Sequence, residues 1–181
     1  HIDRLYRSLR YVRIDPEMTP QDMQAATERL LEANRERLTP NAMYRVGHWV
    51  TRGVDSESMA ALAAGPATVM IFFRPVDTAA IARNHAQGVQ LSITTTRRNP
   101  PACVETRAKV TSKMNQILAE LDAAARGKLS LMLDLDGNVA ENAVANIFIA
   151  RDGVLWTPPE RNILEGVTRK VVFELCEGLG I

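Results

Sequence analysis

The sequence predicts a mixed fold of the α/β or α+β class, arranged in two parts. In the first part, segments with helical periodicity alternate with apolar strand patterns. The paired prolines Pro100 and Pro101 interrupt this pattern, because proline disfavours helix and favours an extended connector. Short strands separated by turn residues are more frequent beyond them. We therefore expect a small N-terminal α/β domain at 1–99, an interdomain linker at 100–106 and the first part of a larger domain at 107–181.

The first predicted helix, within residues 18–38, has a clear start signal. Thr19 is suited to the N-cap, Pro20 to the first helical position and Asp22 to the capping box. Strands are predicted at 42–53, 67–76 and 89–96, and a short helix at 77–88. The strand at 67–76 is bulky and continuous enough to predict burial on both of its faces.

The second part begins with a predicted helix at 112–127. Its apolar stripe consists of four side chains at helical spacing, Met114, Ile117, Leu118 and Leu121. Strands follow within 129–141 and 145–159, where Asp136-Gly137 and Asp152-Gly153 favour hairpin turns. A closing helix is predicted at 166–180, with Thr168 as its N-cap.

Composition and charge exclude several classes of function. The formal net charge is only +1, from 22 basic and 21 acidic residues, so no nucleic-acid partner is expected. The three histidines and two cysteines show no metal-ligand spacing, and we expect a reduced, metal-free, cytoplasmic protein. Apolar runs are too short to span a bilayer. Because the chain opens on His1, we expect a processed or truncated product.

Lys109 is the first candidate for chemistry. It follows Arg107 and precedes Lys113, at the point where an extended segment gives way to a helix. A lysine that forms a Schiff base must be neutral, and partial desolvation or nearby cations lower its pKa. The alternative is a basic, solvated helix start, which is the more common arrangement for a lysine taken alone.

Glu141 is the second candidate, because it stands between a tight turn and an apolar strand. A carboxylate in such a place needs a partner, or its desolvation is costly. It could be a fixed anion for a cationic ring nitrogen, or a turn residue that faces water. The third candidate is the start of the last helix. Gly166 allows close backbone approach there, and the amides of Val167 and Thr168 favour an anion such as phosphate.

A lysine nucleophile, a carboxylate for a protonated heterocycle and an anion site form the set that a pyridoxal-phosphate enzyme requires. Four motifs in order, "HIDRLYRS", "RAK", "LDLDGNVAENAVANIFIARDGVLWTPP" and "ILEGVTRKVVFELCEGLGI", strengthen this interpretation. With them the chain resembles the class IV, fold-type IV pyridoxal-phosphate aminotransferases, and most closely their branched-chain members. The resemblance extends over essentially the whole sequence.

The resemblance implies a role for each matching residue. Lys109 forms the internal aldimine with pyridoxal 5′-phosphate and shuttles the substrate proton, and Arg4 binds the phosphate. Glu141 keeps the pyridine nitrogen protonated, and Val167 and Thr168 form the phosphate loop. The rival lysine, Lys113, fits less well, because the spacing to Gly127 aligns Lys109 with the family lysine.

The resemblance also implies transamination between an α-amino acid, branched-chain-like, and an α-keto acid. It further implies a homodimer and a larger C-terminal domain that is strand-rich and barrel-like. Arg45 matches a substrate-binding arginine of branched-chain enzymes, with a structural ion pair as an equal alternative. The family also has strands before the first motif and a phosphate-binding stretch after the last, so we expect both ends of the fold to be missing.

Several departures leave the substrate open. Met114 stands where branched-chain enzymes carry a tyrosine, and Asn142 replaces a glycine. The stretch after Gly53 lacks the Arg-x-His pair of D-amino-acid aminotransferases, which argues against that branch. Aminodeoxychorismate lyase or amine transaminase activity in the same fold is an alternative. A non-catalytic domain that retains the fold is a further one, although it would not need this set of residues.

Overall fold

A computed structural model describes residues 1–54 and 66–181, and the stretch after Gly53 lies largely outside this range. The chain divides into two compact units, His1–Gly88 and Val89–Ile181. The predicted linker at 100–106 falls inside the second unit, because the strand just after Gly88 pairs with a strand of that unit. The linker remains a prediction about the domain organisation.

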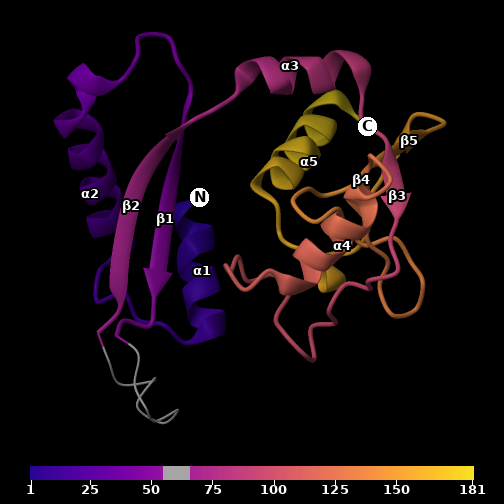
Figure 1. The fold of residues 1–181 in the computed structure, drawn as a ribbon, viewed down its shortest axis with the longest axis horizontal. Coiled ribbons are helices and arrows are strands. Elements are labelled where there is room, and N and C mark those ends of the chain that lie inside the picture. Colours follow the sequence, from indigo (N-terminus) through magenta and orange to yellow (C-terminus); the bar gives the residue numbers. More distant parts are fainter. Residues whose placement is uncertain (55–65) are drawn as a thin grey trace. The chain divides into compact units, whose positions relative to one another are not determined.

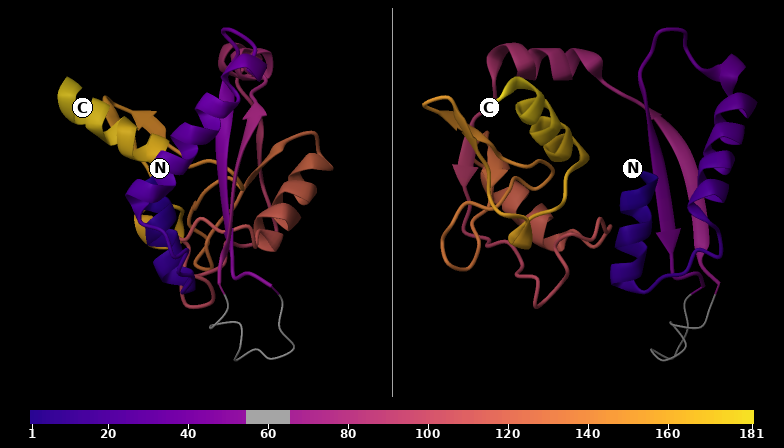
Figure 2. Two further views of the ribbon diagram at one scale, coloured as in Figure 1. Left: turned by 90° about the vertical axis from the view of Figure 1, so that its left-hand side faces the viewer. Right: turned by 180° about the vertical axis from the view of Figure 1, so that it is seen from behind.

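The first unit consists of three α-helices, a 3₁₀ turn and two strands among its described residues (Figure 1). In chain order these are α1 (Ile2–Val12), α2 (Pro20–Ala33), η1 (Arg35–Arg37), β1 (Tyr44–Thr51), β2 (Thr68–Pro75) and α3 (Thr78–Gln87). The strands form a long antiparallel ribbon, and α2 runs alongside it (Figures 1 and 2). Met23 of α2 is fully buried and Leu9 of α1 nearly so.

The predicted start of α2 is confirmed in detail. Thr19 Oγ1 accepts a hydrogen bond from the amide of Asp22 at 3.1 Å, and the Asp22 carboxylate accepts one from the amide of Thr19 at 3.0 Å. Pro20 occupies the first helical position. This reciprocal capping satisfies two amides that the helix itself leaves without acceptors.

The prediction that residues 67–76 are buried on both faces is wrong. β2 pairs with β1 alone among the described strands, and Met70 is 51% exposed. Helix α2 contacts β2, whereas the face that carries Trp49 and Met70 is left open to solvent. The bulky run therefore reflects strand propensity rather than a fully buried strand.

The second unit has short strands and two α-helices among its described residues. In chain order its elements are β3 (Leu91–Ile93), α4 (Met114–Ala124), β4 (Leu129–Leu131), β5 (Ile149–Arg151), β6 (Val154–Trp156), η3 (Glu160–Asn162) and α5 (Val167–Leu179). β3 pairs in parallel with β4, and β5 pairs antiparallel with β6. The predicted turn Asp152-Gly153 is confirmed, since both residues have a positive φ, as a type I′ hairpin requires.

Helix α4 buries a different face from the one that its apolar stripe suggests. Ala119 and Ala123 are fully buried, and the helix packs against β4 and β3 (Figure 1). The side chains of the predicted stripe are exposed by 48% to 64%. The face of α4 that packs is therefore the one that carries these two alanines. None of the described helices has the length and apolar character needed to cross a bilayer.

His48 predicts a pH dependence of stability. Its Nε2 lies 2.9 Å from Thr27 Oγ1, a contact between β1 and α2. Burial lowers the pKa of His48 below its ordinary value of 6.5. The unfolded chain therefore binds a proton near its ordinary pKa, while the folded protein does so only at lower pH. The contribution of His48 is complete above the ordinary pKa and is lost as the pH falls from that value through the lowered pKa of the folded protein.

We expect the urea midpoint to fall between about pH 7.5 and pH 5.5, which brackets an ordinary histidine pKa. Replacing His48→Gln should flatten that part of the profile, because glutamine keeps an N–H for Thr27 and does not titrate. His85→Gln, at an exposed position of α3, is the control. A His48→Gln profile as steep as that of the unchanged protein would contradict the prediction.

Candidate functional site

Glu141 is placed by backbone pairing with the segment that follows β4. The amide of Met132 donates to the carbonyl of Glu141 at 3.0 Å, and the amide of Ala140 donates to the carbonyl of Met132 at 2.9 Å. The chain reverses between them at a turn in which Asp134 Oδ1 accepts the amides of Asp136 and Asn138. Met132 and Ala140 are buried, so the turn delivers Glu141 into the core of the unit.

The Glu141 carboxylate is buried and paired. Only 5% of the residue is exposed. Oε1 accepts a hydrogen bond from Arg98 Nε at 2.8 Å. Oε2 accepts one from the Leu164 amide at 3.0 Å and one from Asn146 Nδ2 at 3.3 Å. These are three of the roughly four hydrogen bonds that a carboxylate can accept. Among the described residues no further group donates to the carboxylate, so one acceptor position, on Oε1, is left. Glu141 is thus a fixed anion rather than a turn residue that faces water.

Lys109 lies in an irregular segment five residues before α4, and its side chain is exposed. The segment is nevertheless anchored. Thr106 is almost fully buried, and its Oγ1 donates to the carbonyl of Arg161, in the η3 turn that precedes α5, at 3.0 Å. Arg98, near the start of the segment, is bound to Glu141. Hydrogen bonds therefore attach the segment that carries Lys109 both to Glu141 and to the η3 turn that precedes α5.

The cations beside Lys109 are partly neutralised. Arg107 donates to both carboxylate oxygens of Glu105, through Nε at 2.9 Å and Nη2 at 2.9 Å. These hydrogen bonds lower the pKa of Glu105 to about 2. The pair offsets the positive field that Arg107 was expected to supply. Lys113 is the N-cap residue of α4 and is half-buried.

Helix α5 begins with an open N-terminus. Its N-cap is Gly166, and no side chain of the described residues caps the helix. The prediction that Thr168 is the N-cap is wrong, since Val167 is already the first helical residue. Thr168 is exposed and Val167 is half-buried. The first amides of a helix have no acceptors within it, so those of Val167 and Thr168 present donors and the positive end of the dipole.

Arg169, in the first turn of α5, adds a buried cation. Only 7% of it is exposed, and Nη1 donates to Glu160 Oε1 at 2.7 Å. Its guanidinium carbon lies 4.7 Å from the centre of the Phe173 ring. Arg169 Nε is buried without a hydrogen-bond partner among the described residues. The start of α5 therefore offers more donors than its surroundings use.

Arg4 and Arg45 belong to the first unit. Arg4 is half-buried on α1, a helix that the sequence analysis did not predict, although Ile2, Leu5, Leu9 and Val12 have helical spacing. The residues Lys109, Glu141, Val167 and Thr168 all belong to the second unit, where contacts through Arg98, Thr106 and Leu164 connect their segments.

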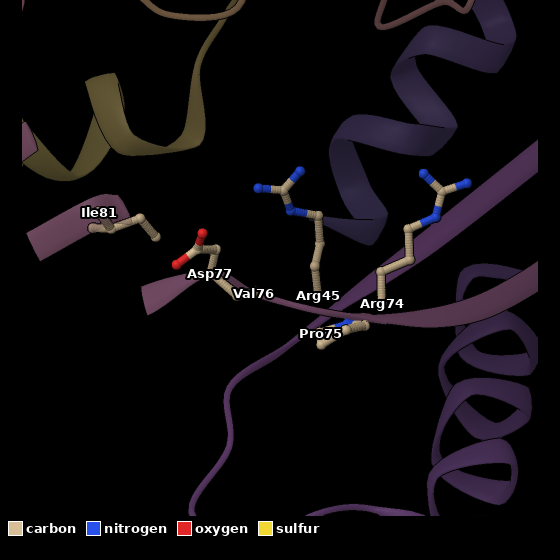
Figure 3. A pocket seen from close by; sticks show the side chains of 6 residues that line it. All are labelled: Arg45, Arg74, Pro75, Val76, Asp77 and Ile81. Carbon is tan, nitrogen blue, oxygen red and sulfur yellow. The ribbon is translucent and has the colours of Figure 1, made fainter. Parts of the chain in front are cut away.

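Arg45 lines a surface pocket of about 270 Å³ in the first unit (Figure 3). Its direct partner across the β1–β2 ribbon is Arg74, and both side chains rise from the same side (Figure 3). Like charges directly opposite one another destabilise a sheet. No carboxylate of the described residues forms an ion pair with either arginine, and Asp77 caps α3 through the amide of Ala80. The pocket is therefore suited to an anion.

Sequence analysis missed three residues that lie beside Glu141 or beside Arg45. Arg98 is one of two adjacent arginines before a proline, and nothing local distinguishes it from Arg97. Asn146 lies in an apolar strand pattern, where a polar residue could have been a signal. Arg74 could have been found by aligning the two strands. No group of three or more His, Cys, Asp or Glu side chains in the described ranges could hold a metal ion.

The departures from the family pattern have different structural roles. Asn142 is buried, and its Nδ2 donates to the carbonyl of Ser130 at 2.7 Å and to Ser130 Oγ at 3.1 Å. It therefore ties the Glu141 segment to β4. Met114 is 64% exposed at the start of α4. A thioether cannot donate a hydrogen bond, so Met114 does not substitute for a tyrosine hydroxyl.

The family model of class IV aminotransferases matches residues 1–181. A Methanocaldococcus jannaschii protein, named provisionally as a branched-chain-amino-acid aminotransferase, is 32% identical over all of this chain and 60% of its own length. The Salmonella typhimurium branched-chain-amino-acid aminotransferase is 33% identical over 52% of this chain and 32% of its own. The chain thus spans 60% or less of the length of these relatives.

Solved structures show the same fold. A branched-chain amino acid aminotransferase from Thermobaculum terrenum, in its PLP-form, matches with a TM-score of 0.83 and 26% identity, over 100% of this chain and 58% of that one. A Thermoproteus uzoniensis branched-chain aminotransferase with norvaline matches with a TM-score of 0.83 and 30% identity, over 100% and 59%. The predicted fold class is confirmed.

Proposed function

Because this chain belongs to the class IV aminotransferases, we propose that the protein transfers an amino group between an α-amino acid and an α-keto acid, with pyridoxal 5′-phosphate as cofactor. We propose a branched-chain-like amino acid as the donor, by analogy with the named relatives. The observation that carries this proposal is the buried Glu141 carboxylate, which has one acceptor position left and is bonded to the segment leading into α5.

The residues fit the cofactor by their chemistry. A buried carboxylate beside Arg98 suits a protonated pyridine nitrogen, for which Glu141 would offer its remaining acceptor position. The uncapped start of α5 suits a phosphate, through the amides of Val167 and Thr168 and the helix dipole. Arg4 is the side chain that we assign to the same phosphate.

Bound pyridoxal phosphate supplies an aldehyde and an electron-withdrawing ring. Lys109 would provide the amine for this aldehyde, and its Nζ would hold and move the proton at the substrate Cα. Glu141 holds a proton at the ring nitrogen, because its fixed negative charge favours the protonated ring. Arg98 in turn orients the Glu141 carboxylate through their buried ion pair.

Arg45 and Arg74 are proposed to bind the substrate carboxylate. Two guanidinium groups on one side of the ribbon, without carboxylate partners among the described residues, favour a bidentate anion (Figure 3). Arg74 is held by stacking, with its guanidinium carbon 4.9 Å from the Phe72 ring centre. It can therefore meet an anion with little further ordering.

We expect Arg45→Met and Arg74→Met each to raise KM for the keto acid by roughly 10- to 100-fold, as the loss of a charged hydrogen bond implies. Arg29→Met, at an exposed position of α2, is the control and should leave KM unchanged. Steady-state kinetics with varied keto acid measure the effect. Equal KM values for Arg74→Met and the control would remove Arg74 from the substrate site.

The proposed function is tested by adding pyridoxal phosphate, reducing with borohydride and mapping the labelled peptide. The label is expected on Lys109. Label on Lys113, or none on the protein, would overturn the assignment. An amine-exchange assay with an added keto acid distinguishes transamination from lyase chemistry, since only the former consumes the keto acid.

We further propose a cytoplasmic homodimer, as the family resemblance implies. Cys103 and Cys176 are both free, which is usual in a reducing compartment. Light scattering on the purified protein tests the dimer, and a monomer with undiminished activity would refute it.

A further inference from the structure

Asn146 connects the two parts of the second unit that the proposed function uses. Its Nδ2 donates to Glu141 Oε2 at 3.3 Å and to the carbonyl of Leu164 at 3.0 Å. The amide of Leu164 donates to the same Glu141 oxygen at 3.0 Å. The three residues therefore form a closed set of hydrogen bonds, in which both backbone groups of Leu164 are held.

The other side of the Asn146 amide lies against the start of α5. A Cβ added to Gly166 would stand 2.0 Å from Asn146 Oδ1, so the glycine is required for space. Its φ of −69° is open to any residue, and backbone freedom is not the reason. Gly166 is the N-cap residue, and the amides of Val167 and Thr168 follow directly. One side chain thus touches both the acid and the helix start.

We propose that Asn146 is a positioning residue that fixes the span between the Glu141 carboxylate and the α5 N-terminus, and so the affinity for the cofactor phosphate. This inference rests on the proposed function. A ring nitrogen and a phosphate on one rigid ring engage two anchors together only if these are correctly spaced. A misplacement of about 0.5 Å is enough to weaken such a site.

The amide is chemically suited to this task. Both of its acceptors, a carboxylate and a carbonyl, require the NH₂ group, so the orientation of the side chain is fixed by its partners. An aspartate at this position would place a second carboxylate beside Glu141 and compete for Arg98. A neutral double donor of this length connects the anchors without disturbing the charge that Glu141 offers to the ring.

The test compares the dissociation constants of pyridoxal 5′-phosphate and of pyridoxal, which lacks the phosphate, by absorbance titration of the whole protein. The ratio of the pyridoxal dissociation constant to the pyridoxal 5′-phosphate dissociation constant measures what the phosphate contributes to the affinity. In Asn146→Ala we expect this ratio to fall by about 10- to 100-fold, the range for loss of an outer-shell partner of a metal ligand. Asn162→Ala is the matched control, because Asn162 Nδ2 donates to Asp134 and not to Glu141.

Each outcome has a separate meaning. A selective loss of phosphate affinity in Asn146→Ala, absent from Asn162→Ala, supports the inference. An unchanged ratio, or equal weakening of both ligands, overturns it and leaves the proposed function intact. If the unaltered protein binds neither ligand, the proposed function fails instead. Asn146→Ser, which keeps a small polar group but not the double donor, provides the same readout if the alanine variant does not fold.

Discussion

Replacing Arg98→Met is expected to lower the free energy of unfolding by about 3–5 kcal/mol, the usual cost of removing one partner of a buried ion pair. Arg98 Nε lies 2.8 Å from Glu141 Oε1, and only 7% and 6% of the two side chains are exposed. The variant leaves a buried carboxylate whose remaining donors, Asn146 and the Leu164 amide, are neutral. Urea titration of the purified protein measures the change.

The buried charge is the cause of this expected loss, and a second substitution separates it from lost packing. Arg98→Met combined with Glu141→Gln removes the unpaired charge while keeping an acceptor for Leu164. We expect the double variant to recover much of the stability lost in the single one, which is a coupling that a double-mutant cycle measures.

A surface ion pair in the same unit provides the control. Arg151 Nε lies 3.2 Å from Asp152 Oδ2, but the side chains are 81% and 86% exposed. Water screens such a pair, so Arg151→Met should leave the urea midpoint unchanged within error. An Arg98→Met variant as stable as Arg151→Met would show that the Glu141 carboxylate is not confined as described.

The elements that sequence analysis predicted well are those fixed by local rules. The α2 capping box needs only Thr19 and Asp22, three residues apart. The turn between β5 and β6 needs only Asp152 and Gly153, which tolerate positive φ. In both cases the physical cause lies within a few residues of its effect, so a single sequence contains it.

The packing of α4 was less predictable, because a helix with two apolar faces leaves the choice to its neighbours. The large stripe beginning at Met114 has the stronger pattern, yet Ala119 and Ala123 are the residues at 0% exposure. They lie on the face of α4 that contacts β4 and β3. Which face of a helix packs depends on the neighbouring elements as well as on the spacing of its apolar residues.

The candidate site also contains residues that the sequence predicted and residues that it did not. Glu141 was found because its motif is local, but its ionic partner is 43 positions away. The sequence does not distinguish Arg97 from Arg98, and only the tertiary structure shows that Arg98 pairs with Glu141. Asn146 was missed for the same reason, since its role depends on Leu164, 18 positions further along the chain. Motifs therefore locate reactive groups, whereas the residues that orient them emerge from tertiary structure.

Replacing Lys109→Ala is expected to reduce the transamination rate by about 10⁴-fold, the upper end of the range for a positioned proton-transfer group. The side chain is exposed, so the variant should retain its fold, with a stability change within about 0.5 kcal/mol. Steady-state kinetics and a urea titration on the same sample measure both. A large loss of rate without a loss of stability identifies a chemical role.

The matched comparison is Lys113→Ala, four residues along the same basic segment. Lys113 is the N-cap residue of α4, and its side chain makes no capping hydrogen bond. Its truncation should therefore leave most of the activity. A small primary amine added to the Lys109→Ala variant should restore part of the rate, because a free amine can carry the proton that Nζ no longer carries. Rescue of Lys113→Ala instead, or equal activity of both variants, would transfer the proton-moving role away from Lys109.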